Sequence, residues 1–405
     1  MTERLEKARV LIYSHDSFGL GHLRRCRAIA HSLVEQYKGL SVLILSGSPI
    51  IGSFDFRARV DFVRIPGVIK LHNGEYTSLA LHIDLSQTLK MRESIIRHTA
   101  EIFAPDLFLV DKEPLGLKGE VTDTLNMLKR SGTRVVLGLR DIMDESSLLR
   151  SEWERKHVMP ALRDLYDEIW IYGIAQMGDP LSEVGAPPQL LAKTLFTGYL
   201  RRPVPSEPVL RAPIDLDAPF LLVTTGGGGD GFAMIDAILN AYETDTTLPY
   251  PALMVFGPFM PPAQQDEFLA RVAQLGSVEA ITFDSHLENL MVRAAGVVSM
   301  GGYNTFCEIL SFNQRAILMP RTKPRAEQAI RAARAAEFGL VKVLDPENGL
   351  SVETTIRALH ELPHQPLPSD AEIPDLLDGL DTINQRVKDG IESRSIMPPV
   401  AQSIA

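Results

Sequence analysis

The chain has 405 residues, of which 45% are hydrophobic and 23% charged, and its formal net charge is −10 at pH 7. A chain of this length is expected to fold as two domains of roughly 150–200 residues, and its acidic balance disfavours general nucleic-acid binding. No run approaches the ~18–20 apolar residues of a membrane span, and the N-terminus lacks the apolar stretch of a secretory signal. The two cysteines, Cys26 and Cys307, lack metal-ligand spacing and are expected as reduced thiols.

Short apolar runs alternate with helical segments through the first half of the chain. The amphipathic stretches 22–33, 85–103 and 119–130 lie between the runs and predict helices. Strand–helix alternation predicts an α/β fold with a mostly parallel sheet, covered on both faces, that binds ligands at the carboxyl ends of its strands. The predicted strands are 10–13, 41–45, 60–65, 107–110, 134–139 and 168–172.

The first predicted strand runs into a glycine turn and then into a helix that begins near His22. Gly19 and Gly21 let the backbone approach a ligand closely, and the helix directs free N–H groups and its positive dipole end into the turn. This arrangement suits an anionic or polar ligand. His22, with an ordinary pKa of about 6.5, is the first candidate for a general base, and contact with a donor phosphate or a purely structural role stays open.

Charged residues follow other predicted strands of the first half. Asp111 and Glu113 come after the fourth strand, and Arg140 and Asp141 come after the fifth. Charges gathered at one edge of a sheet indicate the wall of an active site, although loops are commonly polar without any such role. Asp111 and Glu113 are therefore candidate catalytic residues and Arg140 and Asp141 candidate binding residues, with Asp16 and Asp141 as further competitors for the base.

The pattern restarts after a proline-rich polar stretch at 198–208, which is predicted to be a linker. A predicted strand at 219–225 is followed by four glycines and a helix at 232–242, so each half opens with a strand, a glycine loop and a helix. The tail 370–393 has helical patterning, and 396–405 is expected to be frayed. The domains are predicted at 1–200, 201–370 and 371–405, with further strands at 252–256, 278–283, 295–299, 316–320 and 341–343.

A second glycine pair, Gly301 and Gly302, follows a predicted strand and precedes a helix, as in a phosphate cradle. Thr305 can cap that helix or touch a phosphate oxygen. Glu308, about one turn further on, can accept hydrogen bonds from both hydroxyls of a ribose. The alternative is that Glu308 is a first-turn acid that stabilises its own helix dipole.

A basic loop at 321–325 precedes another helix, which is predicted to begin near Ala326. Its cations, Arg321 among them, can neutralise a diphosphate, whereas the alternative is a solvated loop. Glu327 and Gln328 lie in the first turn of the helix, where side chains can reach a sugar. Arg331 and Arg334 are predicted to lie on a solvated helix face. An Asp-Leu-Asp run at 215–217 is expected to be a solvated turn, so no metal site is predicted.

Together these motifs resemble the GT-B glycosyltransferases, particularly the branch with the peptidoglycan N-acetylglucosaminyltransferase that acts on lipid I. Within that branch the chain is most similar to a group of bacterial predicted glycosyltransferases without a settled substrate, through the stretches 14–16, 110–116 and 138–141. The motifs that carry the resemblance occur in order and at domain-scale spacing, and they are 19–22, 224–229, 301–305 with Glu308, and 327–328.

The resemblance implies two doubly wound Rossmann-like domains that face each other across a cleft, with a C-terminal helix that crosses back to the first. It implies an inverting, metal-independent transfer from a nucleotide-sugar, most often a UDP-sugar, to an acceptor that enters near Gly19. It places the ribose on Glu308, the uracil near Phe283 and the donor sugar on Glu327 and Gln328. By resemblance, the donor-binding residues are Thr225, Gly226, Gly227, Gly228, Phe283, Gly301, Gly302, Tyr303, Asn304, Thr305, Glu308, Glu327 and Gln328, and Arg321 joins this set on its charge alone.

The nucleotide-sugar is a substrate, so the resemblance implies no cofactor, and no nucleic-acid partner is expected. A cytoplasmic location is expected, with peripheral contact at the inner face of the membrane left open. The first turn has fewer glycines than the lipid I enzyme and the loop 321–325 differs from its donor loop, so acceptor and donor sugar do not transfer.

Two other readings stay open. The stretch 19–26 also resembles a nucleotide-sugar hydrolase of nonulosonic acid pathways, which has the same fold and delivers water to the sugar. A non-catalytic nucleotide-sugar sensor is the third reading. The charged edge of the first half favours an enzyme over a sensor.

Overall fold

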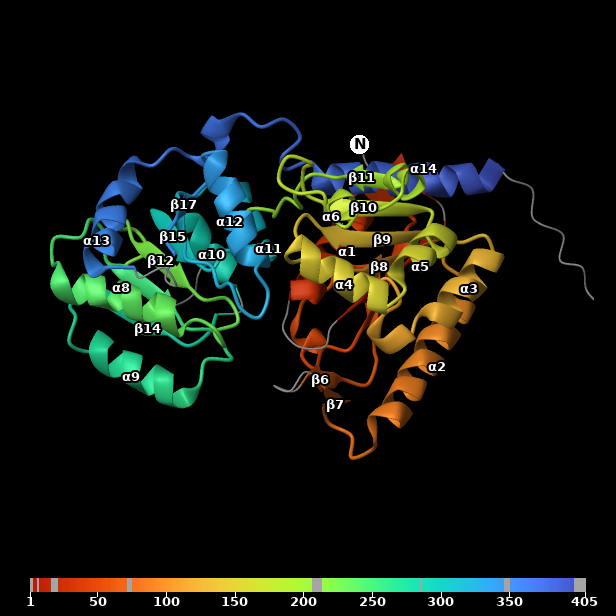
Figure 1. Ribbon diagram of the computed structural model, residues 1–405, viewed down its shortest axis with the longest axis horizontal. Coiled ribbons are helices and arrows are strands. Elements are labelled where there is room, and N and C mark those ends of the chain that lie inside the picture. Colours follow the sequence, from red (N-terminus) through yellow and green to blue (C-terminus); the bar gives the residue numbers. More distant parts are fainter. Residues whose placement is uncertain are drawn as a thin grey trace, which may run out of the picture. The chain divides into compact units, whose positions relative to one another are not determined.

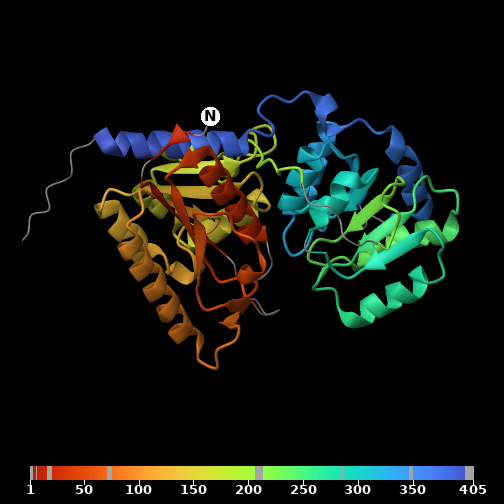
Figure 2. The ribbon, with the colours of Figure 1, turned by 180° about the vertical axis from the view of Figure 1, so that it is seen from behind.

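The computed structural model describes residues 3–5, 7–15, 21–70, 75–205, 213–284, 286–345 and 350–396 (Figures 1 and 2). The chain divides into two compact units. Unit 1 comprises Met1–Asp141, Ser146–Leu200 and Asp378–Ala405, and unit 2 comprises Ile142–Glu145 and Arg201–Leu377.

Within the described residues, unit 1 is built on a parallel 7-stranded sheet with the strand order β11-β10-β9-β8-β2-β4-β5. The chain thus winds outward from β2 in one direction and then in the other, which places the switch point at the carboxyl ends of β2 and β8. The six predicted strands are confirmed, and β11 is an additional strand at the edge. The strands are β2 (Arg9–Ser14), β4 (Ser41–Ser46), β5 (Val60–Arg64), β8 (Leu107–Asp111), β9 (Arg134–Arg140), β10 (Glu168–Tyr172) and β11 (Thr194–Phe196).

The strands of unit 1 are apolar because the sheet is buried on both faces. Four consecutive residues of β2 are 0% exposed: Val10, Leu11, Ile12 and Tyr13. The side chains therefore do not alternate between buried and exposed, as they would in a strand with one face in solvent. α1 (Gly21–Gln36) packs on β2 and β4, and α2 (Leu85–Phe103) packs against α3 (Thr122–Arg130). Because both faces of the sheet are covered, a ligand can reach the sheet at the polar ends of its strands.

The last helix, α14 (Gly379–Ile396), packs against α1 and belongs to unit 1, which confirms the predicted return of the chain (Figure 2). It begins later than the predicted helical tail. The Tyr37 hydroxyl donates to the Asn384 carbonyl at 3.0 Å, and the Glu168 carboxylate accepts from both Arg386 and Arg134. These contacts fasten a helix to strands that lie more than two hundred residues earlier.

Several short elements of unit 1 do not appear in the sequence prediction. β6 and β7 form an antiparallel pair, and β1 and β3 form a parallel pair. Runs of two to four residues carry too little periodicity to be recognised in a sequence. The short elements are β1 (Glu3–Arg4), β3 (Tyr37–Lys38), β6 (Val68–Lys70), β7 (Tyr76–Ser78), η1 (Ile51–Ser53), η2 (Leu117–Gly119), α6 (Pro180–Glu183) and α7 (Pro188–Leu191), beside the longer α4 (Ser146–Arg155) and α5 (Val158–Leu165).

We expect Gly138→Ala to destabilise unit 1 by about 1–3 kcal/mol through overpacking. A Cβ on Gly138 would overlap the Tyr172 ring, which crosses β9 at this point. The free energy of unfolding from urea titration measures the effect. Gly52→Ala is the control because a Cβ there meets nothing within 4 Å, and equal stability of both variants would contradict the prediction.

Within the described residues, unit 2 holds a parallel 6-stranded sheet with the order β14-β13-β12-β15-β16-β17. This is the 3-2-1-4-5-6 order of a dinucleotide-type Rossmann sheet, so the second doubly wound domain is confirmed. The strands are β12 (Leu221–Thr224), β13 (Ala252–Val255), β14 (Val278–Ile281), β15 (Gly296–Ser299), β16 (Ala316–Leu318) and β17 (Lys342–Val343).

The helices of unit 2 follow the predicted alternation. α13 packs against α8, and α8 packs against α9. Across the ranges that the structure describes, no helix of either unit is long and apolar enough to cross a membrane. The helices are α8 (Phe232–Thr244), α9 (Pro262–Val272), α10 (Leu287–Arg293), α11 (Tyr303–Ser311), α12 (Glu327–Glu337), α13 (Val352–Glu361), η4 (Leu362–His364) and η5 (Pro368–Ala371).

The segment Ile142–Glu145 follows β9 of unit 1 but belongs to unit 2. Asp144, which is 6% exposed, accepts the backbone N–H of Ala326 at 3.1 Å and lies 3.6 Å from the Arg325 guanidinium. The carboxylate thus caps the end of α12 at which the positive dipole lies. A piece of the first half of the chain therefore helps to hold the basic loop of unit 2.

The prediction that Arg331 lies on a solvated helix face is wrong. Its side chain is 0% exposed, it donates to the Ile142 carbonyl at 3.3 Å, and its guanidinium lies 5.5 Å from the centre of the Tyr303 ring. The helix periodicity of α12 could not reveal this, because the covering segment Ile142–Glu145 comes from a distant part of the sequence. Arg331 is a buried structural residue of unit 2.

Candidate active site

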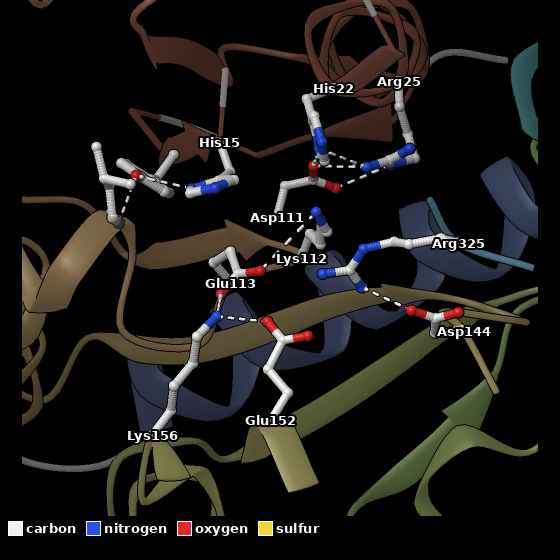
Figure 3. A network of polar contacts seen from close by, with 12 residues as sticks. His15, His22, Arg25, Asp111, Lys112, Glu113, Asp144, Glu152, Lys156 and Arg325 are labelled. Atoms are coloured by element: carbon white, nitrogen blue, oxygen red, sulfur yellow. Dashed lines mark hydrogen bonds and ion pairs between the residues drawn. The ribbon is translucent and has the colours of Figure 1, made fainter. Parts of the chain in front are cut away.

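His22 and Asp111 meet at the switch point of the unit 1 sheet. His22 lies in the first turn of α1, and Asp111 ends β8. The His22 Nδ1 atom lies 2.6 Å from Asp111 Oδ2 (Figure 3). The Asp111 side chain is 0% exposed and that of His22 is 19% exposed, so the imidazole alone of the two is open to a substrate. Gly19, which the sequence places in the preceding turn, lies outside the described residues.

Arg25 completes this cluster, and the sequence analysis did not single it out. Its Nε donates to Asp111 Oδ1 at 2.8 Å and its Nη2 donates to Oδ2 at 2.6 Å, an arrangement that engages both carboxylate oxygens. The signal was present, because Arg25 comes three residues after His22 and therefore lies on the same helix face. The pairing with Asp111 across 86 residues was not visible in the sequence.

The protonation states of the cluster follow from its burial and charges. Burial raises the pKa of the Asp111 carboxyl, but Arg25 and His22 outweigh burial and hold that pKa well below its usual range. Burial lowers the pKa of His22; Arg25 adds to the fall, and the bond to Asp111 opposes it. His22 is therefore neutral at pH 7, with its Nδ1–H donated to Asp111 and its Nε2 lone pair available.

Glu113, the second predicted catalytic carboxylate, is paired with lysines. Its Oε2 accepts from Lys156 at 3.0 Å, and Lys112 lies 3.8 Å from Oε1. Burial raises the pKa of Glu113, but the neighbouring Lys112, His15 and Lys156 outweigh burial and lower it to about 2. Figure 3 shows Lys156 bridging Glu113 and Glu152. An ionised carboxylate held in this way is a poor proton acceptor.

Asp141 and Arg140 lie at the end of β9, as predicted. Asp141 is 1% exposed and accepts a hydrogen bond from the Tyr199 hydroxyl at 2.6 Å. This bond joins the end of β9 to the last residues of unit 1 before the chain enters unit 2. Arg140 is partly exposed at the same edge. A structural role thus accounts for Asp141, while Arg140 remains a candidate for ligand contact.

A buried network lies beside this site, and the sequence analysis did not identify its contacts. Arg92 donates twice to Glu120 at 2.6 Å, and the Tyr13 hydroxyl donates to Glu120 at 2.5 Å. Because the Tyr13 hydroxyl donates its proton to Glu120, it can only accept from His15. His15 Nδ1, at 3.3 Å, is therefore the donor to the Tyr13 hydroxyl oxygen. The His15 and His22 rings lie 5.9 Å apart, edge to face. No spacing in the sequence indicates these partners, because they come from three separate elements.

In unit 2 the glycine loop after β12 is packed tightly on the loop after β13. A Cβ on Gly257 would lie 2.6 Å from the Gly226 carbonyl, and both glycines have positive φ. Gly228, at φ +93°, meets the Phe256 carbonyl in the same way, and the Thr225 hydroxyl donates to that carbonyl. Close packing thus accounts for part of the glycine pattern. Among the predicted phosphate contacts, the Thr225 hydroxyl is already used in this packing. Gly227 lies in the same loop, between the tightly packed Gly226 and Gly228.

The second glycine pair precedes α11 as predicted, and Gly301 has a φ of +71°. Asn304 accepts from the Arg202 guanidinium at 2.9 Å, so a cation lies at the first turn of this helix. Glu308 is 1% exposed. Of the other predicted contacts on α11, Tyr303 is buried, whereas Gly302 and Thr305 are partly exposed.

Arg321 lies between two predicted parts of the donor site. Its Nε is 3.3 Å from Asp230, which follows the first glycine loop, and its backbone N–H donates to the Gln328 side chain at 3.4 Å. A Cβ on Gly302 would lie 3.9 Å from the Gln328 amide. The structure thus brings together the loop 226–230, Gly302, Arg321 and the start of α12. Glu327 adjoins them but is only 7% exposed.

Phe283 follows β14 and is 49% exposed, an unusual exposure for a phenylalanine. Phe259, 37% exposed, lies over the glycine loop, since a Cβ on Gly227 would meet its ring at 3.4 Å. Exposed aromatic rings at the carboxyl ends of strands can stack on a base. Among the residues that the structure describes, no group of three or more His, Cys, Asp or Glu side chains is placed to hold a metal ion.

Residues 221–373 match the glycosyltransferase family 28 C-terminal domain. The matched segment begins with β12 and covers both glycine loops, Glu308 and the start of α12. The match identifies the sheet of unit 2 as a glycosyltransferase domain and the chain as a glycosyltransferase. No curated protein matches the sequence significantly.

Solved structures of the same fold cover almost the whole chain. TcCGT1 in complex with UDP is 15% identical, with a TM-score of 0.65 over 96% of this chain and 100% of that one. MurG of Acinetobacter baumannii is 12% identical, with a TM-score of 0.57 over 95% and 99%. A putative UDP-N-acetylglucosamine 2-epimerase from Listeria monocytogenes is 13% identical, with a TM-score of 0.61 over 97% of each chain. These likenesses show the GT-B fold.

Proposed function

We propose that the protein transfers a sugar from a UDP-sugar to an acceptor hydroxyl, without a metal ion and with inversion at the anomeric carbon. The observation that carries this proposal is the 2.6 Å contact between His22 and the buried Asp111 at the switch point of unit 1. A neutral imidazole that donates Nδ1–H to a carboxylate presents Nε2 as a proton acceptor. That is the group needed to activate a hydroxyl for attack.

In the proposed step, the acceptor oxygen attacks the anomeric carbon while its proton passes to His22 Nε2. The new carbon–oxygen bond forms as the bond from the anomeric carbon to the diphosphate oxygen breaks, and the nucleoside diphosphate leaves with the electron pair. Attack on the face opposite the leaving group inverts the anomeric centre. Asp111 stabilises the imidazolium that forms, as an ionised carboxylate does for any oriented histidine.

The leaving diphosphate gains negative charge, and unit 2 supplies groups that can stabilise it. The N-terminus of α11, with Gly301 and Gly302, presents backbone N–H groups and the positive end of a helix dipole. Arg321 lies beside the first glycine loop and is held there by Asp230. We propose that these groups perform the role that a metal ion has in other glycosyltransferases, and that Glu308 binds the ribose. The resemblance to the lipid I branch and the UDP in the TcCGT1 complex support a uridine donor.

We expect Phe283→Ala to weaken UDP binding about 5- to 150-fold, since base–aromatic stacking contributes about 1–3 kcal/mol. The Phe283 side chain is half exposed, so its removal should leave the fold stable. Isothermal titration of UDP into the full chain measures the change in Kd. Leu269→Ala is the matched control, because Leu269 is 42% exposed on α9. An unchanged Kd for Phe283→Ala would remove this residue from the nucleotide site.

The products of a reaction with labelled nucleotide-sugars test the proposed function. A thermal-shift panel of nucleotide-sugars first identifies the donor, since a ligand that binds only the folded protein raises its Tm. Incubation of that donor with candidate acceptors should give a glycosylated acceptor and free nucleoside diphosphate. Release of free sugar alone would instead identify a hydrolase, and binding without turnover would identify a sensor. No shift with any uridine nucleotide would contradict the donor assignment.

A further inference from the structure

We propose that Arg25 is the positioning residue of the base: it orients Asp111 through both carboxylate oxygens, and its charge opposes protonation of the neighbouring His22. This inference rests on the proposed function, in which His22 accepts the proton of the acceptor hydroxyl. It goes beyond that function because it assigns a separate residue to the control of the base.

The geometry leaves one consistent pattern of hydrogen bonds. Asp111 Oδ2 accepts from Arg25 Nη2 and from His22 Nδ1, both at 2.6 Å, while Oδ1 accepts from Arg25 Nε. Arg25 Nη2 also lies 3.0 Å from His22 Nδ1. Since a guanidinium can only donate, Nδ1 keeps its proton for Asp111 and makes no hydrogen bond with Arg25. The position of the proton on His22 is therefore set by both neighbours at once.

The same short distance gives Arg25 an electrostatic effect on His22. A second proton on the imidazole would place a positive charge next to the guanidinium, in a site with little water. The Arg25 side chain is 3% exposed, and its guanidinium lies 5.7 Å from the centre of the Tyr172 ring. The Tyr172 ring occupies the space that a Cβ on Gly138 would fill. The guanidinium is thus enclosed and cannot turn toward solvent to avoid the repulsion.

The other charged groups that face His22 do not replace this effect. Asp111 favours the protonated imidazole, whereas Lys112 disfavours it less strongly than Arg25 does. The His15 ring, 5.9 Å away, is itself buried, and burial holds its pKa well below the ordinary value. Without Arg25 the effect of burial on the pKa of His22 would remain, but the charge of Asp111 would be opposed less strongly, so His22 would be protonated at a higher pH.

Two substitutions separate the charge of Arg25 from its geometry. Arg25→Gln removes the charge, and we expect the acidic limb of the kcat/KM profile to move up by about 1–3 pH units. Arg25→Lys keeps the charge but engages one carboxylate oxygen, so the limb should stay in place while kcat falls at least about tenfold. Arg27→Met is the control, because Arg27 lies on the same helix as Arg25 but contacts Asp55 and Phe54, which are not part of the cluster. The donor is the UDP-sugar that the thermal-shift panel identifies and that gives turnover with an acceptor.

A direct titration of His22 by NMR, assigned with His22→Gln and recorded without substrate, makes the test independent of activity. An unchanged pKa of His22 in Arg25→Gln would overturn the charge effect, and a wild-type kcat in Arg25→Lys would overturn the positioning role. If Arg25→Gln does not fold, the NMR titration of Arg25→Lys still decides, since a rise of one unit or more there contradicts the inference. If the pKa of His22 moves but the pH profile does not follow it, the base of the proposed function is wrong and the effect of Arg25 stands.

Discussion

Replacement of His22 by alanine is expected to lower kcat by about 10²- to 10⁴-fold, the usual contribution of a general base. The variant loses the Nε2 acceptor, whereas Arg25 still pairs both oxygens of the buried Asp111, so that carboxylate stays neutralised. The fold should therefore survive. Initial rates of UDP release with the active UDP-sugar measure the loss, and far-UV circular dichroism with the Tm verifies the structure.

The control for this prediction is His98→Ala. The His98 side chain is 72% exposed on α2, and its nearest carboxylate, Glu101, is 3.8 Å away. Its removal should change neither kcat nor the Tm. A His22→Ala enzyme with a wild-type rate would eliminate the proposed base, and the search would then turn to the competing carboxylates. Of these, Glu113 is neutralised by lysines and Asp141 is bonded to Tyr199, so both are weaker candidates.

The second large effect is expected for stability. Glu120→Gln should destabilise unit 1 by about 3–5 kcal/mol, because it leaves the charge of Arg92 buried without its partner. Both side chains are 1% exposed, and Glu120 accepts from Arg92 twice and from Tyr13 once. Urea unfolding of the full chain, followed by tryptophan fluorescence, measures the change; Trp153 and Trp170 both lie in unit 1.

Glu35→Gln is the matched control, since the pair of Glu35 with Arg57 is 67% and 45% exposed. Such surface pairs contribute about 0–1 kcal/mol. The double variant Glu120→Leu with Arg92→Met should recover much of the loss, because it removes both charges together. A Glu120→Gln protein as stable as Glu35→Gln would show that the buried pair is not a stabilising element of unit 1.

Local patterns in the sequence were sufficient for the scaffold of both units. Continuous apolar runs predicted the buried parallel strands, and the glycines before helices predicted the turns at Gly226 and Gly301; the structure confirms both, whereas the turn before α1 lies outside the described residues. These signals are local because a buried strand or a tight turn needs particular residues at that place. Periodicity also identified α2 with its bounds, Leu85–Phe103.

The candidate site was predictable only in part, for a physical reason. The sequence identified His22 and Asp111 separately as candidate catalytic residues, but their 2.6 Å contact depends on how β2 and β8 pair. The sequence made Glu113 a candidate catalytic carboxylate, whereas the fold pairs it with Lys156, which directly follows α4. In the sequence, Arg25 is one residue of a basic helix start. In the structure, its pairing with Asp111 accounts for its burial.

The sequence by itself thus determined the parallel α/β architecture, the two glycine-loop units and the position of His22 at a helix start, because each depends on neighbouring residues. Only the tertiary structure decided which charges are paired and buried. Arg331 lies under Ile142–Glu145, Glu120 meets Arg92, and α14 returns to α1, all across separations that no local pattern records. Burial of a charge is decided by what covers it, and here the covering residues come from elsewhere in the chain.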